Sequence, residues 1–167
     1  MTHKILQNIQ SNRVCYGITH CDGKFYYCSD LEEIRRIDLK TKTNQLLVPT
    51  KDIGQYSYIS SDGKKLLVSS NTETVTCCDM NGKEIWRFEV ISFLRSPQSV
   101  VVDHQGFVFV VGEKSRSIVV ISADGNSAKK VYQISSPRAM CYDNSENEIL
   151  VCHTDRTASW FQISLDV

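Results

Sequence analysis

Residues 97–125 read PQSVVVDHQGFVFVVGEKSRSIVVISADG. Runs of Val, Ile and Phe are closed by polar turns, and each turn carries a Gly. Short β-branched runs bounded by such turns are typical of β-strands. Taken alone, this stretch is compatible with one pair of hairpins or with one copy of a repeated unit.

The same pattern recurs along the chain. YGITHCDGKFYYCSD (16–30) aligns with YSYISSDGKKLLVSS (56–70) at a shift of 40 residues, and Tyr, Asp, Gly, Lys and Ser coincide. PQSVVVD (97–103) aligns with PRAMCYD (137–143) at the same shift. A shift of 43 superposes Gly63 on Gly106, and it also superposes the triplet 66–68 on 109–111 without a gap. A period of 40 to 43 residues indicates a repeat architecture.

Each copy contains short strands rather than helices. In the third copy we expect strands near 97–103, 106–112, 117–122 and 128–133, and in the second near 56–61, 65–70, 73–79 and 83–89. Four antiparallel strands every forty-odd residues predict the blades of a β-propeller. The second strands (YYC, LLV, VFVV, ILV) are almost continuously apolar, so we expect them to be covered on both faces. A β-sandwich or barrel is the alternative, and the matched turns disfavour it.

The predicted propeller spans residues 14–163, with blades near 14–53, 54–96, 97–136 and 137–163. The fourth copy ends after strands near 137–143, 147–153 and 157–163. Residues 1–13 contain the strand-like HKILQNI, for which two interpretations stay open. It completes the fourth blade, or it is the last strand of an upstream blade. Open sheet edges favour self-association, and we expect it if the ring is incomplete.

The stretch PQSVVVDHQGFVFVV, followed by RSIVVISADG, resembles the NHL repeat, and PRAMCYDNSENEILVCHTD is a weaker match. The whole run resembles the C-terminal propeller of tripartite-motif proteins. This resemblance implies an all-β fold, a partial ring of a six-bladed propeller, and a partner-reading role in a ubiquitin ligase system. The ligase activity would reside in RING segments, and this sequence has no such zinc pattern.

Many NHL repeats continue with Asp after the second strand. Asp30 fits that pattern, whereas Ser70, Gly112 and His153 do not.

Composition and motifs favour a binding protein over an enzyme. Lys plus Arg equals Asp plus Glu at 19 each, which disfavours a broadly basic nucleic-acid binder. The four histidines are scattered, and the motifs of hydrolases and nucleotide-binding loops are missing from the sequence. Some propellers hydrolyse esters with a central metal, but Asp103 and Asp143 end their strands, where a turn role suits them. We therefore expect no catalytic residue, no metal and no cofactor, with a metal-dependent hydrolase as the least favoured function.

The seven cysteines are Cys15, Cys21, Cys28, Cys77, Cys78, Cys141 and Cys152. Zinc-site spacing is missing, and most of these residues lie in apolar runs, where a free Cys behaves as a small buried hydrophobe. We expect free thiols and hence a reducing, cytoplasmic location.

We expect no membrane segment, because no apolar run approaches the length of a span. Core packing is also the role expected for four aromatic residues, Trp86, Phe88, Trp160 and Phe161.

Propellers bind partners through loops at one rim. That rim should carry the loops between second and third strands (29–33, 70–74, 112–117, 153–157) and the links between copies. The first loop is acidic, whereas the later ones are basic. The predicted partner-binding residues are Lys51, Arg95, Lys114, Arg116, Arg138 and Arg156. A protein or peptide partner is expected first. RNA is the alternative, but the loops contain few aromatic residues for base stacking.

Overall fold

The structure is a computed structural model that describes residues 8–11, 13–30, 32–49, 56–70, 73–89 and 92–164. Across these ranges the chain forms fifteen β-strands and no helix, as an all-β fold requires. In the same ranges, therefore, no helix is long and apolar enough to cross a membrane.

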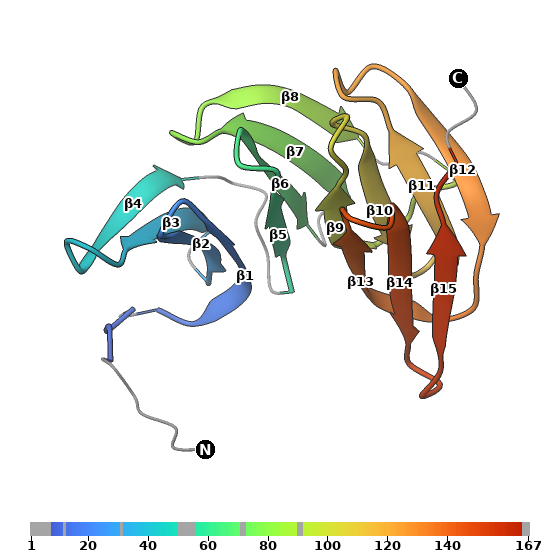
Figure 1. The fold of residues 1–167 in the computed structure, drawn as a ribbon, viewed down its shortest axis with the longest axis horizontal. Coiled ribbons are helices and arrows are strands. Elements are labelled where there is room, and N and C mark those ends of the chain that lie inside the picture. Colours follow the sequence, from blue (N-terminus) through green and yellow to red (C-terminus); the bar gives the residue numbers. More distant parts are fainter. Residues whose placement is uncertain are drawn as a thin grey trace.

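The strands form four consecutive antiparallel sheets, which we call blades 1 to 4 (Figure 1). Each strand pairs with the next one in the sequence, so every blade is a meander. Blade 1 consists of β1 (Cys15–Cys21), β2 (Lys24–Ser29), β3 (Glu33–Asp38) and β4 (Thr43–Pro49). Blade 2 consists of β5 (Tyr58–Ser61), β6 (Lys65–Ser70), β7 (Thr74–Asp79) and β8 (Glu84–Glu89). Blade 3 consists of β9 (Pro97–Val102), β10 (Val108–Gly112), β11 (Ser117–Ile121) and β12 (Ala128–Gln133). Blade 4 has three strands, β13 (Pro137–Asp143), β14 (Glu148–His153) and β15 (Ala158–Gln162).

The blades follow one another along an arc, with the first strand of each blade on the inside (Figure 1). β1 packs on β5, β5 on β9, and β9 on β13. In the described part of the chain, no comparable packing joins β13 back to β1. The observed fold is therefore a β-propeller arc of four blades, which confirms the predicted fold class. Residues 1–7 and 12 of the predicted N-terminal strand lie outside the described residues. Residues 8–11 and 13 contain no strand.

Apolar side chains between neighbouring blades form three separate cores. Blades 2 and 3 meet through residues such as Leu67 and Val110, and blades 3 and 4 meet through residues such as Phe109 and Ile149. Alternate residues of a strand point to opposite faces, so β6 and β10 each contribute to two cores. Both strands are covered on both faces, as predicted. The same prediction is wrong for β14, where Leu150 is exposed, because no fifth sheet packs on blade 4 in the described structure.

The gapless superposition of 66–68 on 109–111 is also wrong by one residue. Leu66 pairs with Ser61 across the first hairpin of blade 2, whereas Val108 pairs with Val102 in blade 3. The connection in blade 3 is therefore one residue longer. Leu67 corresponds in space to Phe109, because both face the following blade. A shift of one residue exchanges the two faces of a strand, so this insertion must be placed correctly before blade faces are compared.

The turns repeat in backbone conformation even where their residues differ. The turn between second and third strands holds a residue with positive φ in every blade, namely Glu32 (57°), Glu73 (74°), Arg116 (52°) and Arg156 (71°). Non-glycine residues adopt this conformation infrequently. Two of the predicted binding residues, Arg116 and Arg156, thus occupy equivalent positions in consecutive blades.

All seven cysteines are free thiols, as expected. Only Cys28, Cys77 and Cys78 are buried, however, whereas Cys15, Cys141 and Cys152 are exposed. Cys141 and Cys152 lie in apolar strands of blade 4, but on its uncovered face. The same uncovered face accounts for Trp160, which is 71% exposed although it was predicted to be core. Phe161, Trp86 and Phe88 are partly buried and pack against the cores.

The buried thiols predict how stability depends on pH. Burial raises the pKa of Cys28 and Cys78 to about 12 and that of Cys77 to about 11. An unfolded thiol ionises near its ordinary pKa of about 8.5. The three thiols therefore favour the folded state fully below that pH, and their contribution is lost as pH rises towards the folded pKa values. We expect their contribution to the free energy of unfolding, measured in urea, to begin to fall near about pH 8.5 and to be lost by about pH 12.

The control for this prediction is the triple variant Cys28→Ala, Cys77→Ala, Cys78→Ala, which removes the thiols and leaves the other titrating groups in place. Its stability should depend less steeply on alkaline pH than that of the original chain. Equal slopes for the two proteins would show that the thiols do not cause the loss.

Candidate binding site at the blade rim

The links between blades and the loops between second and third strands lie at the same rim, as predicted. In three blades the residue that follows the second strand donates a backbone hydrogen bond to the link that precedes the first strand. The bonds are Asp30 N to Val14 O (3.1 Å), Glu113 N to Ser96 O (3.0 Å) and Thr154 N to Ser136 O (3.0 Å). These bonds hold each loop against the adjacent link. The rim is therefore built from short, hydrogen-bonded turns.

A cluster of four side chains, one from each blade, lies at this rim, and we call it the rim cluster. Its members are Tyr16 of blade 1, Tyr56 just before blade 2, Glu113 of blade 3 and Arg138 of blade 4. The two tyrosine rings are 6.3 Å apart at their centroids. The Arg138 guanidinium lies 5.8 Å from the centroid of the Tyr56 ring, within the range of a cation–π interaction. Arg138 also forms a 3.4 Å ion pair with Glu113.

Glu113 is held in place from below by a buried glutamine. The Gln98 side chain amide donates a hydrogen bond to Glu113 Oε2 over 3.2 Å, and Gln98 is only 3% exposed. The opposite amide orientation would place the Gln98 carbonyl oxygen against a carboxylate, which is unfavourable. In the observed orientation Gln98 Oε1 is buried and finds no hydrogen-bond partner among the described residues. A buried acceptor of this kind is costly to leave unpaired. The residue that holds Glu113 in place therefore has a buried hydrogen-bond acceptor that is not satisfied.

The structure places five of the six predicted basic residues at this rim, and one of the five, Arg138, is ion-paired and not a free cation. Lys114, Arg116 and Arg156 are exposed in the loops of blades 3 and 4, and Arg95 is exposed in the preceding link. Arg138 is half-buried, and Glu113 offsets its charge. Lys51 lies outside the described residues. The later blades thus present exposed cations on the same rim as a cluster whose Arg138–Glu113 pair carries no net charge.

The acidic end of the rim is smaller than the sequence indicates. Asp30 and Glu32 are exposed, but Glu33 forms a 2.9 Å ion pair with Arg35 on the neighbouring part of blade 1. Both members of this pair are largely buried, with side chains 15% and 19% exposed. Glu33 therefore stabilises blade 1 rather than offering a free charge to a partner.

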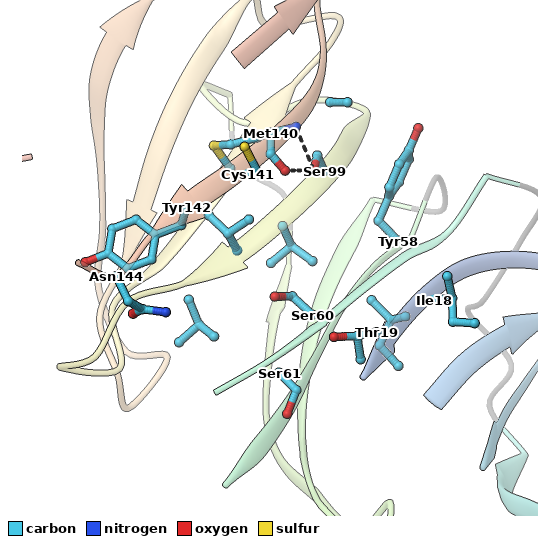
Figure 2. A pocket seen from close by; sticks show the side chains of 15 residues that line it. Ile18, Thr19, Tyr58, Ser60, Ser61, Ser99, Met140, Cys141, Tyr142 and Asn144 are labelled. Carbon is cyan, nitrogen blue, oxygen red and sulfur yellow. Dashed lines mark hydrogen bonds between the residues drawn. The ribbon is translucent and has the colours of Figure 1, made fainter. Parts of the chain in front are cut away.

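Below the rim, the first strands of all four blades line an open pocket of about 380 Å³ (Figure 2). The residues that line it are uncharged and include Thr19, Ser60 and Asn144. Ser99 Oγ accepts from Met140 N over 3.1 Å and donates to Met140 O over 3.2 Å, which joins blades 3 and 4. The lining contains no carboxylate or imidazole, so the cavity suits a neutral polar group.

The two aspartates considered as metal ligands have turn roles, as predicted. Asp103 Oδ1 accepts backbone hydrogen bonds from Gln105 (2.9 Å) and Phe107 (2.8 Å). Asp143 Oδ1 accepts from both the backbone and the hydroxyl of Ser145. Among the described residues, no three His, Cys, Asp or Glu side chains gather as a metal site would require.

The loop sequences alone do not reveal the rim cluster, because its two tyrosines lie outside the loops. Tyr16 and Tyr56 lie at the boundary between link and first strand. A signal was present, since both tyrosines occupy the same repeat position at a shift of 40 residues. Their 6.3 Å contact shows that this shared position brings aromatic rings together at the rim.

Comparisons with known proteins support the fold and leave the family open. No family model matches the sequence, and no curated protein matches it either. Many solved structures are similar. A chain of the crystal structure of a nidogen/laminin complex aligns with a TM-score of 0.76 at 18% identity, over 90% of this chain and 61% of that one.

Two computationally designed proteins are also similar. The Ika4 protein aligns with a TM-score of 0.73 at 12% identity, over 98% of this chain and 100% of that one. The Ika8 protein aligns with a TM-score of 0.68 at 14% identity, over 89% of this chain and 46% of that one. This chain thus spans about three fifths of the nidogen/laminin chain and less than half of Ika8. At these identities the likeness shows the fold alone, and that fold is a β-propeller.

Proposed function

We propose that this chain is a non-catalytic recognition module that binds an extended, acidic peptide segment of a partner protein across the rim cluster. The observation that carries the proposal is the convergence of Tyr16, Tyr56, Glu113 and Arg138 from four different blades. A surface to which every blade contributes is held in position by the whole fold. Rigid scaffolds of this kind are the usual support for binding loops.

The residue types at the rim suit a protein partner. Tyrosine and arginine are the side chains that most often dominate binding energy at protein interfaces. Tyr56 is 54% exposed and already lies beside a guanidinium, so a partner can pack on its ring without rearranging the cluster. The exposed cations of blades 3 and 4 lie on the same rim as this cluster and would attract carboxylates and accelerate association.

We further propose that the module works within a ubiquitin ligase system in the cytoplasm. The resemblance to NHL repeats supports a substrate-reading role in a tripartite-motif-like ubiquitin ligase system, with ligase chemistry supplied by other segments. The seven free thiols support a reducing location, which we take to be the cytoplasm.

Charge reversal at the rim tests the proposal. Lys114→Glu, Arg116→Glu and Arg138→Glu together should weaken binding of acidic peptides by more than about tenfold, because like charges placed opposite each other cost several kcal/mol. The peptides would be selected from a random displayed library with the original chain, and their affinities measured by fluorescence polarisation. Selected peptides should be rich in Asp and Glu.

The matched control carries the same change in charge at the opposite rim, with Lys40→Glu, Lys42→Glu and Lys83→Glu in the exposed turns between third and fourth strands. This control should bind the selected peptides as the original chain does. Equal weakening by both triple variants would show that overall charge causes the loss of binding, and it would contradict the rim site.

RNA is the competing outcome of the same experiment. If phosphates are the natural ligand, an RNA stem-loop pool should bind more tightly than any peptide, and its affinity should fall steeply as salt rises. That result, with no enrichment of acidic peptides, would reject the peptide-binding proposal.

A further inference from the structure

The outward face of blade 4 is apolar and uncovered. Cys141, Leu150 and Trp160 lie side by side across its three strands and point away from blade 3. Leu150 is 40% exposed and Trp160 is 71% exposed. The next row on this face consists of Ala139, Cys152 and Ala158, of which Cys152 and Ala158 are exposed.

The equivalent positions in earlier blades are buried. Leu67 at the middle of β6 is 0% exposed, and Phe109 at the middle of β10 is 1% exposed, because the following blade packs on each of them. Leu150 occupies the same place in β14. It is apolar like the other two, and its exposure results only from the lack of a following sheet. The outward face of blade 4 thus continues an interface that the molecule already forms within itself.

The outward face of blade 1 is the matching surface at the other end of the arc. Ile18, Tyr27, Arg35 and Leu46 form one row across its four strands. Ile18 is 60% exposed and Leu46 is 48% exposed. Between them, Tyr27 is buried, and its hydroxyl is hydrogen-bonded to the Asn44 side chain. Asn44 also donates to the backbone oxygens of Gln10 and Ser11, so these two residues lie against the centre of the face. The apolar side chains at its two ends remain exposed.

We propose that two copies of this chain assemble into one closed ring, in which blade 4 of each copy packs on blade 1 of the other. The contact would reproduce the blade-to-blade packing found inside the chain. Curvature supports this occupant, because the arc superposes on 46% of the Ika8 chain and so leaves room for about as many blades again. A second copy supplies four blades. A closed two-fold assembly also avoids an open-ended chain of contacts. The inference does not depend on the rim site.

The first test is the mass of the purified chain in solution, measured by sedimentation equilibrium over a range of concentrations. One chain has a mass of 19.0 kDa, and we expect twice that value at the higher concentrations. A mass of one chain at all concentrations would overturn the proposal. Open-ended growth to larger species would overturn it as well, because the ring would then not close with two copies.

Variants at the two faces distinguish this ring from other dimers. Leu150→Glu and Ile18→Glu should each reduce the mass to that of one chain, since each face is needed at both contacts. Ile85→Glu is the matched control, because Ile85 is 51% exposed on the outer strand β8 and lies on neither face. This control should remain dimeric. If Leu150→Glu dissociated the dimer while Ile18→Glu did not, two blade 4 faces would be packing on each other, and the proposed ring would be wrong.

A mixture of the two variants gives a sharper result. A heterodimer of Leu150→Glu with Ile18→Glu contains one unchanged contact and one contact with both substitutions. The mixture should therefore regain part of the dimer that neither variant forms alone. Failure of the mixture to regain any dimer would count against the proposed pairing of faces.

Thiol protection tests the same contact without any substitution. Cys141 and Cys152 are exposed on the outward face of blade 4. Their alkylation by iodoacetamide, followed by mass spectrometry, should slow as the concentration of the original chain rises and dimer forms. Alkylation rates that do not change while the mass doubles would place the dimer contact elsewhere and reject the proposal.

Discussion

Phe109→Ala should lower the free energy of unfolding by about 3–5 kcal/mol, the range measured for truncation of a buried Phe. Phe109 lies at the middle of β10, is 1% exposed, and belongs to the core between blades 3 and 4. Its ring is stacked on that of Tyr142, with centroids 6.3 Å apart and planes 15° apart. Alanine removes this ring from the core between blades 3 and 4, so both burial and ring contact are lost.

Urea unfolding followed by circular dichroism measures this loss. A domain of ordinary stability has about 5–15 kcal/mol in total, so the variant should unfold at a much lower urea concentration. Leu39→Ala is the control, because Leu39 is 45% exposed in a turn of blade 1 and its truncation should change stability by less than about 0.5 kcal/mol. Similar losses for both variants would mean that blade 4 does not depend on this core.

Gly17→Ala should be the second most damaging change, with an expected loss of about 2–3 kcal/mol from overpacking. Gly17 lies in β1, where its backbone N–H donates a 2.9 Å hydrogen bond to Ser57 O at the start of blade 2. A Cβ at Gly17 would lie 2.7 Å from both Ser57 O and Tyr58 Cα. These neighbours are backbone atoms, so the two blades would have to separate to accommodate one methyl group.

Gly23→Ala separates this packing effect from backbone strain. Gly23 has a φ of 68°, but a Cβ there would meet no atom within 4 Å. Its replacement should cost only the left-handed strain of about 1–2 kcal/mol. We therefore expect Gly17→Ala to lose more stability in urea than Gly23→Ala does. The reverse order would show that the close approach of blades 1 and 2 can relax.

The sequence was enough to predict the strands, the turns and the repeat. Residues 97–125 alternate apolar strands with turn residues, and this information is local, because side-chain periodicity and turn preference act over a few positions. The observed strands of blade 3 begin and end within two residues of the predicted ones. The shared rim also followed from the order of the strands, since consecutive antiparallel strands return each loop to the same side.

Burial and contact between blades were decided only by the tertiary structure. Leu67, Phe109 and Leu150 are apolar residues at the same repeat position, and the first two are buried while the third is exposed. No property of Leu150 itself distinguishes it. Whether a sheet face is covered depends on which sheet stands next to it, and that neighbour is not encoded in the strand.

The rim cluster shows the same limit for function. Arg138 could be predicted as a rim cation, but its ion pair with Glu113 and its contact with Tyr56 join residues of three different blades. Local sequence patterns determine how each blade forms because they act between neighbours in the chain. The charge, exposure and grouping of the rim residues depend on distances between separate blades, and only the packed arc determines those distances.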